Sequence, residues 1–171
     1  TYLGEMNDAT DRGYTASVSE ALRQGVNFID TSLNYRNQRS ERAIELSLRD
    51  AADRRDEFVV WTKAGYMVPD ALPAARLSAA DVVGGIHSIA PAFLADQLER
   101  SLRNLEVESL DLLQLHCPPS EVYDMPEVFG ILDGLQQQGK LRNYGVSVER
   151  VEEAMKTITY PNVKSVQIIF N

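Results

Sequence analysis

The sequence has one cysteine, only two histidines and no long apolar run, and each shortage excludes a kind of protein. A single cysteine, Cys117, excludes an intrachain disulfide framework and is typical of a protein from a reducing cytoplasm. With His87 and His116 it makes too small a ligand set for a structural zinc site, so we expect no metal. Because the longest apolar stretches are only strand-length, we expect no membrane span and no signal peptide.

Basic residues are also scarce. The 171 residues include 17 Lys and Arg against 25 Asp and Glu, a formal net charge of −8. No run of Lys or Arg forms a basic stripe, so nucleic acid and anionic membranes are poor candidates as partners. Apolar residues, by contrast, make up 44% of the chain, which is enough for one packed core. No sequence signal indicates an oligomeric state.

Short apolar runs alternate with helical patterns along the chain. Runs rich in branched or aromatic residues predict parallel strands at 26–29, 58–61, 110–115, 141–146 and 163–170, after an opening fragment at 1–4. Apolar stripes predict helices at 11–24, 41–48, 91–105, 125–138 and 151–158, with Ser40 and Ser147 as N-caps. About six strands with five crossovers indicate an α/β fold of βα units around a parallel sheet, in one domain over residues 1–171.

One stretch, residues 65–90, lacks such a pattern. Proline, glycine and alanine are spread through it, and it directly follows a predicted strand. We expect an irregular insertion that serves as a lid or substrate loop. His87 lies within it and has no evident partner in the sequence, so we interpret it as structural or solvent-exposed.

Four polar residues stand at or just past the ends of predicted strands. They are Asp30 and Tyr35 after the run 26–29, Lys63 after 58–61 and His116 after 110–115. The carboxyl ends of parallel strands share one rim, where ligands bind. An acid, a phenol, an amine and an imidazole are therefore expected to meet there as a catalytic constellation.

These segments resemble the aldo-keto reductase superfamily. Residues 25–32, followed by Tyr35 and by Ser40-Glu41, are similar to the first family signature, in which the catalytic Asp precedes the catalytic Tyr by five positions. Residues 61–63 and 111–116 match the strands that carry the catalytic lysine and histidine. The resemblance covers essentially the whole chain in the family's order. It implies a (β/α)8 TIM barrel with Asp30, Tyr35, Lys63 and His116 as its tetrad.

The same resemblance implies a set of cofactor contacts. Segment 139–147 is similar to the one whose serine, here Ser147, holds the nicotinamide carboxamide, and Gln167 falls where a glutamine lies against the same ring. Thr1, Tyr2 and Asp30 are assigned to the nicotinamide surroundings as well. The family default favours NADPH over NADH.

The chain also departs from the family pattern. Residues 36–39 make the loop after the catalytic tyrosine longer and more basic, and Val148 stands where Asn often follows the serine. A full eight-stranded barrel needs roughly 250 residues. The last two strand–helix units are absent, together with the Lys and Arg loops that grip the adenosine 2′-phosphate. We therefore expect an incomplete barrel that is part of a longer protein.

The tetrad suits carbonyl reduction by direct hydride transfer from a nicotinamide. A tyrosine has an ordinary pKa of about 10 and needs tuning to act near neutrality. The Lys63 ammonium would lower the pKa of Tyr35, and Asp30 would fix the lysine. Tyr35 is then the general acid in reduction and the general base in oxidation. His116 would orient the carbonyl of an aldehyde, ketone or sugar.

Other interpretations stay open. Each of the four residues alone could be an ordinary turn, packing or surface residue, and their joint spacing favours function. Cys117 is interpreted as a buried bystander, and Glu149, Glu152 and Glu153 as a solvated helix face. The protein could also be a nucleotide-binding regulatory subunit or an inactive truncated paralogue of the same fold.

Overall fold

The computed structural model describes residues 4–68, 82–84 and 86–169. The predictions for Thr1, for Tyr2, for most of the opening strand and for the middle of the 65–90 insertion therefore lie outside the described residues.

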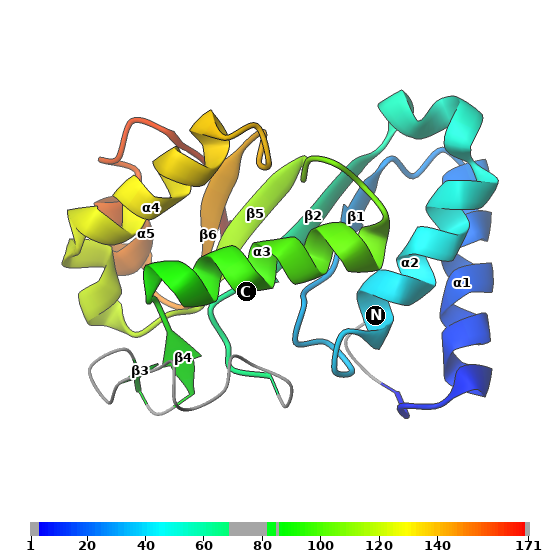
Figure 1. Ribbon diagram of the computed structural model, residues 1–171, viewed down its shortest axis with the longest axis horizontal. Coiled ribbons are helices and arrows are strands. Elements are labelled where there is room, and N and C mark those ends of the chain that lie inside the picture. The colour runs from blue at the N-terminus through cyan, green and yellow to red at the C-terminus, as the bar shows by residue number, and fades with distance from the viewer. Residues whose placement is uncertain (1–3, 69–81, 85, 170–171) are drawn as a thin grey trace.

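Five parallel strands form one sheet in the order β1–β2–β5–β6–β7 (Figure 1). The strands are β1 (Phe28–Asp30), β2 (Val59–Ala64), β5 (Leu112–His116), β6 (Tyr144–Val148) and β7 (Val163–Ile168). Because every neighbouring pair is parallel, all five carboxyl ends lie along one edge. At this edge Gln167 on β7 donates a hydrogen bond of 2.9 Å to Asp30 on β1, so the sheet curves enough for side chains of its first and last strands to meet.

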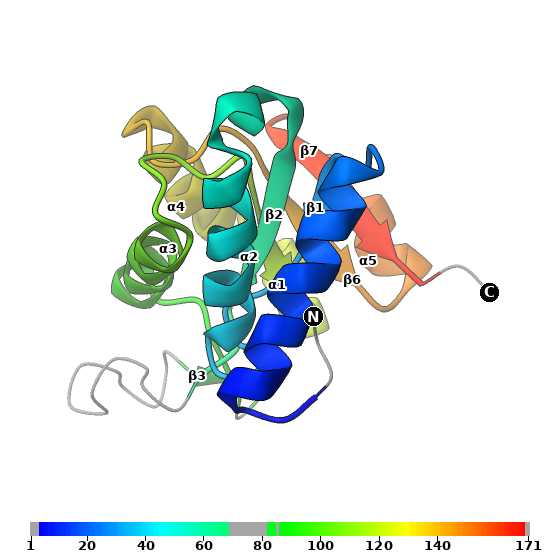
Figure 2. The same cartoon turned by 90° about the vertical axis from the view of Figure 1, so that its right-hand side faces the viewer.

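Helices connect the strands and pack on one side of the sheet. They are α1 (Asp8–Arg23), α2 (Arg39–Asp50), α3 (Pro91–Leu105), α4 (Pro126–Gln137) and α5 (Val151–Thr157), with 3-10 helices η1 (Ala52–Glu57) and η4 (Ser120–Asp124). Figure 1 shows α3 crossing in front of β2 and β5, with α1 and α2 beside one end of the sheet and α4 and α5 beside the other. Figure 2 shows the same layers from the side, with α1 and α2 next to β1 and β2. The arrangement is half of a barrel, with helices outside and strands inside.

The core fills the space between helices and sheet. Its fully buried members include Ile44 of α2, Leu94 and Leu98 of α3, Leu113 of β5 and Leu132 of α4. The opposite face of the sheet is less covered. The paired residues Phe28 and Val59, on β1 and β2, remain 47% and 39% exposed there.

Gly145 sets the spacing between β6 and β7. The strand register shifts between Tyr144 and Gly145, and a Cβ atom at position 145 would overlap the backbone oxygen and the hydroxyl of Ser165. Only glycine permits this close approach of two backbones.

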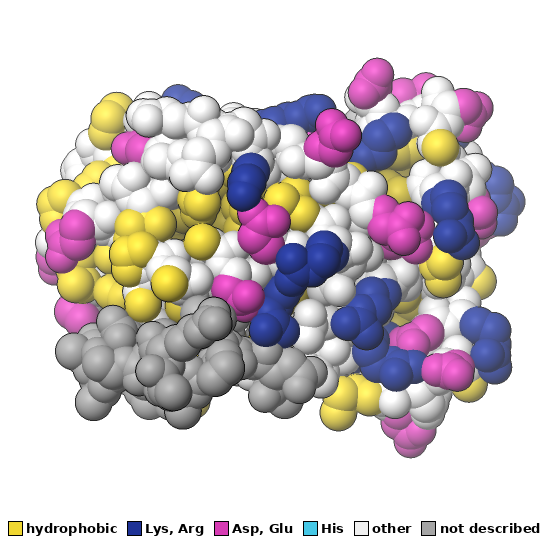
Figure 3. Space-filling view, viewed as in Figure 1, with side chains coloured by type: hydrophobic (Ala, Val, Ile, Leu, Met, Phe, Trp, Pro, Cys, Tyr) yellow, Lys and Arg dark blue, Asp and Glu magenta, His cyan; other side chains and the backbone are white. Residues whose placement is uncertain are grey.

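The surface is charged and mixed. On the face shown in Figure 3, Lys and Arg side chains are interspersed with Asp and Glu. Among the helices of the described residues, none is long and apolar enough to cross a membrane.

Several predicted boundaries shift. Strand β2 runs on to Ala64, so that Thr62 and Lys63 belong to it. Ser40 lies inside α2, whose N-cap is Gln38 in the left-handed conformation (φ 71°). Ser147 belongs to β6, and α5 is instead capped at Arg150. Ser147 was a poor guide to the helix start because it pairs in register with His116 of β5 and Gln167 of β7.

The insertion at 65–90 is partly regular. Strands β3 (Val82–Val83) and β4 (His87–Ser88) pair antiparallel, and Tyr66 forms a further bridge to His87. The interpretation of this insertion as a lid or substrate loop depends mainly on residues outside the described ones and stays a prediction.

Candidate active site

The four predicted catalytic residues come together at the carboxyl edge of the sheet. Asp30 ends β1, Lys63 is the penultimate residue of β2, and His116 ends β5. Tyr35 lies in the turn after β1. Tyr35, Lys63 and His116 line a pocket of about 210 Å³. Asp30 is not one of its lining residues, but it forms an ion pair with Lys63. The remaining lining residues are Cys117, Ser147, Val148, Glu149, Gln167, Ile168 and Ile169.

Lys63 is the central residue of this group. Its side chain is 2% exposed, and its Nζ forms an ion pair with Asp30 and donates a 2.9 Å hydrogen bond to the Thr31 carbonyl. The same Nζ lies 5.1 Å from the centre of the Tyr35 ring. Burial lowers the pKa of Lys63, and the Asp30 carboxylate opposes that effect. The site thus holds an ammonium next to a phenol.

The turn that presents Tyr35 is held by its arginines. Arg36, Asn37 and Gln38 have positive φ of 50°, 50° and 71°. The Arg36 guanidinium donates to the Glu5 carbonyl at 2.6 Å and pairs with Asp11 at 2.6 Å. The basic residues that distinguish this loop from the family pattern therefore bind the loop to the start of α1.

His116 is held as a neutral imidazole. Its Nδ1 lies 3.0 Å from the Ser32 hydroxyl, and its ring meets the Tyr35 ring edge-on at 5.6 Å. Burial lowers the pKa of His116 to about 3, and the positive charge of Lys63 adds to this shift. At neutral pH the ring can donate or accept one hydrogen bond but carries no charge.

Two of the predicted cofactor residues lie beside the tetrad. Ser147 on β6 and Gln167 on β7 both line the pocket. Gln167 donates to Asp30, while its Oε1 is buried and has no partner within the part of the chain that is described. An unpartnered amide oxygen at a pocket wall suits a ligand that carries an amide N–H, as the carboxamide of a nicotinamide does.

Three side chains differ from their interpretation in the sequence. His87 is buried, and its Nε2 lies 2.9 Å from the His116 carbonyl oxygen, so it has a partner. Glu153 is not solvated but buried: it accepts hydrogen bonds from Ser120 Oγ and from the Glu149 and Arg150 amides. Cys117 is half-buried on the pocket wall, with its Sγ 3.1 Å from the Ser147 Oγ and a thiol pKa raised by burial.

Sequence reasoning also missed a buried carboxyl behind the site. Glu41 of α2 is fully buried and accepts hydrogen bonds from Thr62 (2.6 Å), Ser101 (2.7 Å) and Asn104 (2.7 Å). Burial raises the pKa of Glu41. The network ties α2 and α3 to the strand residue next to Lys63. Its sequence signal was its place in the Ser40-Glu41 pair of the family signature, which did not indicate that the carboxyl is buried.

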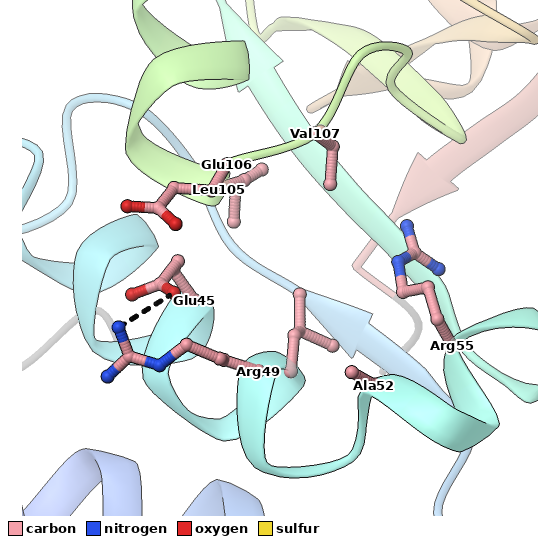
Figure 4. A pocket seen from close by; sticks show the side chains of 8 residues that line it. Glu45, Arg49, Ala52, Arg55, Leu105, Glu106 and Val107 are labelled. Atoms are coloured by element: carbon pink, nitrogen blue, oxygen red, sulfur yellow. Dashed lines mark ion pairs between the residues drawn. The ribbon is translucent and has the colours of Figure 1, made fainter.

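A second pocket lies at the other end of the sheet. It has a volume of about 230 Å³ and is formed where α2 and α3 end, before β2 and β5 begin. Figure 4 shows Glu45 and Arg49, an ion pair at 3.8 Å, on one side of it and Arg55 on the other. None of the tetrad lies there. In barrels this end serves stability rather than chemistry.

The model of the aldo/keto reductase family matches residues 4–171. The chain belongs to the aldo/keto reductase family. Its half-barrel is an incomplete (β/α)8 barrel of that family's type, as the resemblance predicted. This confirms the predicted fold class.

Individual relatives agree with this membership. The uncharacterized oxidoreductase YqkF of Bacillus subtilis is 26% identical over 99% of this chain and 51% of its own length. The glycerol dehydrogenase of Gluconobacter oxydans has a TM-score of 0.73 and 28% identity, covering 98% of this chain and 48% of that one. An aldo/keto reductase of Klebsiella pneumoniae, solved with NADP and acetate, has a TM-score of 0.73 and 22% identity, covering 99% of this chain and 52% of that one. The chain thus spans about half the length of the relatives it matches.

Proposed function

We propose that the protein is an NAD(P)H-dependent oxidoreductase that interconverts small carbonyl compounds and alcohols, with Tyr35 as the acid and base. The observation that carries the proposal is the buried Lys63 ammonium, held by Asp30 and next to the Tyr35 ring. Burying a lysine costs free energy, so the place of Lys63 in this strand calls for a reason other than packing. A buried amine beside a phenol in a pocket is an arrangement with a chemical use.

Tyr35 would protonate the carbonyl oxygen in reduction and take the proton back in oxidation. The Lys63 ammonium stabilises the phenolate that remains after the proton leaves, and Asp30 keeps the ammonium in place. A bound reduced nicotinamide would supply the hydride, because no side chain can do so. The balance is one hydride from the cofactor and one proton from Tyr35 for each carbonyl reduced.

His116 would orient the substrate. In the structure the Ser32 hydroxyl donates to Asn34 Oδ1 at 2.6 Å. With the Asn34 amide turned over, its NH₂ donates to Ser32 instead, the hydroxyl donates to His116 Nδ1, and the ring proton lies on Nε2, where it can hydrogen-bond a carbonyl oxygen. Because its pKa is near 3, the ring stays neutral and does not compete with Tyr35 as a strong acid.

Ser147 and Gln167 would hold the nicotinamide. Both line the pocket, and the buried Oε1 of Gln167 lacks a partner among the described residues. NADPH is the proposed cofactor, in keeping with the family default and with the NADP found in the Klebsiella structure. The substrate class is a small aldehyde, ketone or sugar alcohol, as the glycerol dehydrogenase relative suggests.

The test is a fluorescence titration with NADPH and with NADH, followed by turnover on a panel of small aldehydes. We expect Tyr35→Phe to lower kcat by about 10²- to 10⁴-fold while NADPH affinity is kept. Tyr160→Phe is the matched control, since its hydroxyl bonds the Tyr123 carbonyl away from the pocket, and it should leave kcat unchanged.

Two results would contradict the proposal. Cofactor binding without turnover in the unchanged protein would indicate a regulatory subunit. A folded protein that binds neither NADPH nor NADH would indicate an inactive paralogue.

A further inference from the structure

His87 reaches the site through a short antiparallel pairing. After β2 ends, residues 65–67 run beside residues 86–88: Ser88 N donates to the Gly65 carbonyl at 2.9 Å, and Met67 N donates to the Ile86 carbonyl at 2.8 Å. Gly65 has a φ of 118°, which turns the chain out of the sheet. The pairing leaves His87 only 4% exposed.

The His87 imidazole completes the end of β5. Strand β2 pairs with β5 only as far as Ala64 opposite Leu115, so on that side the His116 carbonyl has no strand partner among the described residues. His87 Nε2 lies 2.9 Å from this carbonyl oxygen and donates to it in place of a strand N–H. The next residue, Cys117, takes the left-handed conformation with a φ of 42°, so the hydrogen bond lies where β5 ends in a turn.

A stack of rings adds a second contact. The His87 ring lies against Tyr66 with centroids 4.0 Å apart, and Tyr66 meets the His116 ring edge-on at 4.8 Å. His87 therefore contacts His116 at its backbone directly and at its ring through Tyr66.

The tautomer of His87 follows from its partner. A carbonyl oxygen accepts only, so Nε2 carries the proton and Nδ1 does not. Nδ1 is buried, and no partner reaches it within residues 4–68, 82–84 and 86–169. Burial lowers the pKa of His87, against the effects of the His116 carbonyl and the Glu149 charge, and the ring stays neutral. Among the described residues, the hydrogen bond from Nε2 to the His116 carbonyl is therefore the polar contact that the buried His87 ring makes.

We propose that His87 is a positioning residue for His116: its hydrogen bond to the His116 carbonyl fixes the imidazole that faces the substrate, and its stack on Tyr66 adds only a smaller contact. The proposal rests on the proposed function, in which His116 orients the carbonyl. His87 is not among the residues that line the pocket.

Two substitutions separate the hydrogen bond from packing. His87→Phe keeps a ring for the stack but removes the donor. His87→Gln keeps an N–H donor at the reach of Nε2 and loses the ring. Both variants are made in the full-length protein, and glyceraldehyde is the carbonyl substrate of the assay. His116→Ala and the double variant with His87→Phe complete the cycle.

We expect His87→Phe to lower kcat/KM for glyceraldehyde about tenfold, His87→Gln to stay within about threefold, and NADPH affinity to be unchanged in both. In the His116→Ala background His87→Phe should add no further loss. Equal losses in the two variants, or a loss that persists without His116, would assign His87 a structural role and overturn the proposal.

A second readout does not need turnover. Imidazole ¹⁵N signals of His116, assigned by their loss in His116→Ala, should shift in His87→Phe and return in His87→Gln. Unchanged His116 signals in folded His87→Phe would overturn the proposal by themselves. If the unchanged protein reduces no aldehyde with either cofactor, the proposed function fails, while these signals still decide whether His87 holds His116.

Discussion

At the scale of single residues, the site depends on charges that burial would otherwise remove. An ammonium in an apolar interior costs several kcal/mol unless it is paired. Lys63 meets that cost with the Asp30 carboxylate, which is 39% exposed, and with the Thr31 carbonyl. Burial lowers the pKa of Lys63, and the hydrogen bond and charge of the partly exposed Asp30 oppose that shift.

His116 should make stability depend on pH. In the folded state its pKa is about 3, whereas an unfolded histidine takes a proton near pH 6.5. Between these values the unfolded chain binds more protons, so the free energy of unfolding rises with pH across this window and is lost on acidification. Urea unfolding between pH 4 and 7 should show a shallower rise for His116→Gln than for the unchanged protein. Parallel profiles would mean that His116 is already protonated in the folded state near pH 6.

At the scale of elements, the tightest constraint lies between β6 and β7. Gly145→Ala should push β7 away from β6, because the added Cβ meets the Ser165 backbone, and lower the free energy of unfolding by about 2–4 kcal/mol. Gly134→Ala in α4 is the control: nothing lies within 4 Å of its added Cβ, and it should be neutral or stabilise by about 0.5–1 kcal/mol. The measurement is urea unfolding of both variants. Equal effects would mean that β7 can move aside.

The presence of the strands of the parallel sheet could be predicted from the sequence, but the residues at which they begin and end could not. Apolar runs identified the five strands of the parallel sheet, because buried parallel strands need them, but not the short pair β3 and β4. The run ending at Trp61 did not predict that Thr62 and Lys63 continue β2, because their partners, Glu41 and Asp30, lie on other elements. Polar residues enter a buried strand only when such partners exist, and one sequence does not state which they are.

The candidate site was likewise predictable only in part. The spacing of the motifs predicted that Asp30, Tyr35, Lys63 and His116 would meet at one edge, and they do, while their catalytic roles stay a prediction. The contacts of His87 and Glu153 were not, because each binds backbone groups: the His116 carbonyl, 29 residues away, and the amides of Glu149 and Arg150. Backbone groups are the same at every residue, so no pattern of side chains points to such a contact.

At the scale of the whole molecule, the inner face of the half-barrel should bind apolar probes. Phe28 and Val59 pair across β1 and β2 and are both exposed. The 171-residue chain should therefore enhance the fluorescence of anilinonaphthalene sulfonate in its folded state, and Phe28→Ser with Val59→Thr should reduce the enhancement. Met155→Gln, at a 59% exposed position on α5, should change little. Equal reductions in both would locate the probe elsewhere.

The hydrogen bond from Gln167 to Asp30 joins residues 137 positions apart, and its acceptor is the same carboxylate that holds Lys63. During synthesis Asp30 therefore leaves the ribosome long before the amide that binds it has been made. The carboxylate that pairs with Lys63 gains this contact only after the strands between β1 and β7 have been synthesised and have paired. The geometry of this corner of the pocket thus depends on the whole described sheet being assembled, and not on the turn after β1 alone.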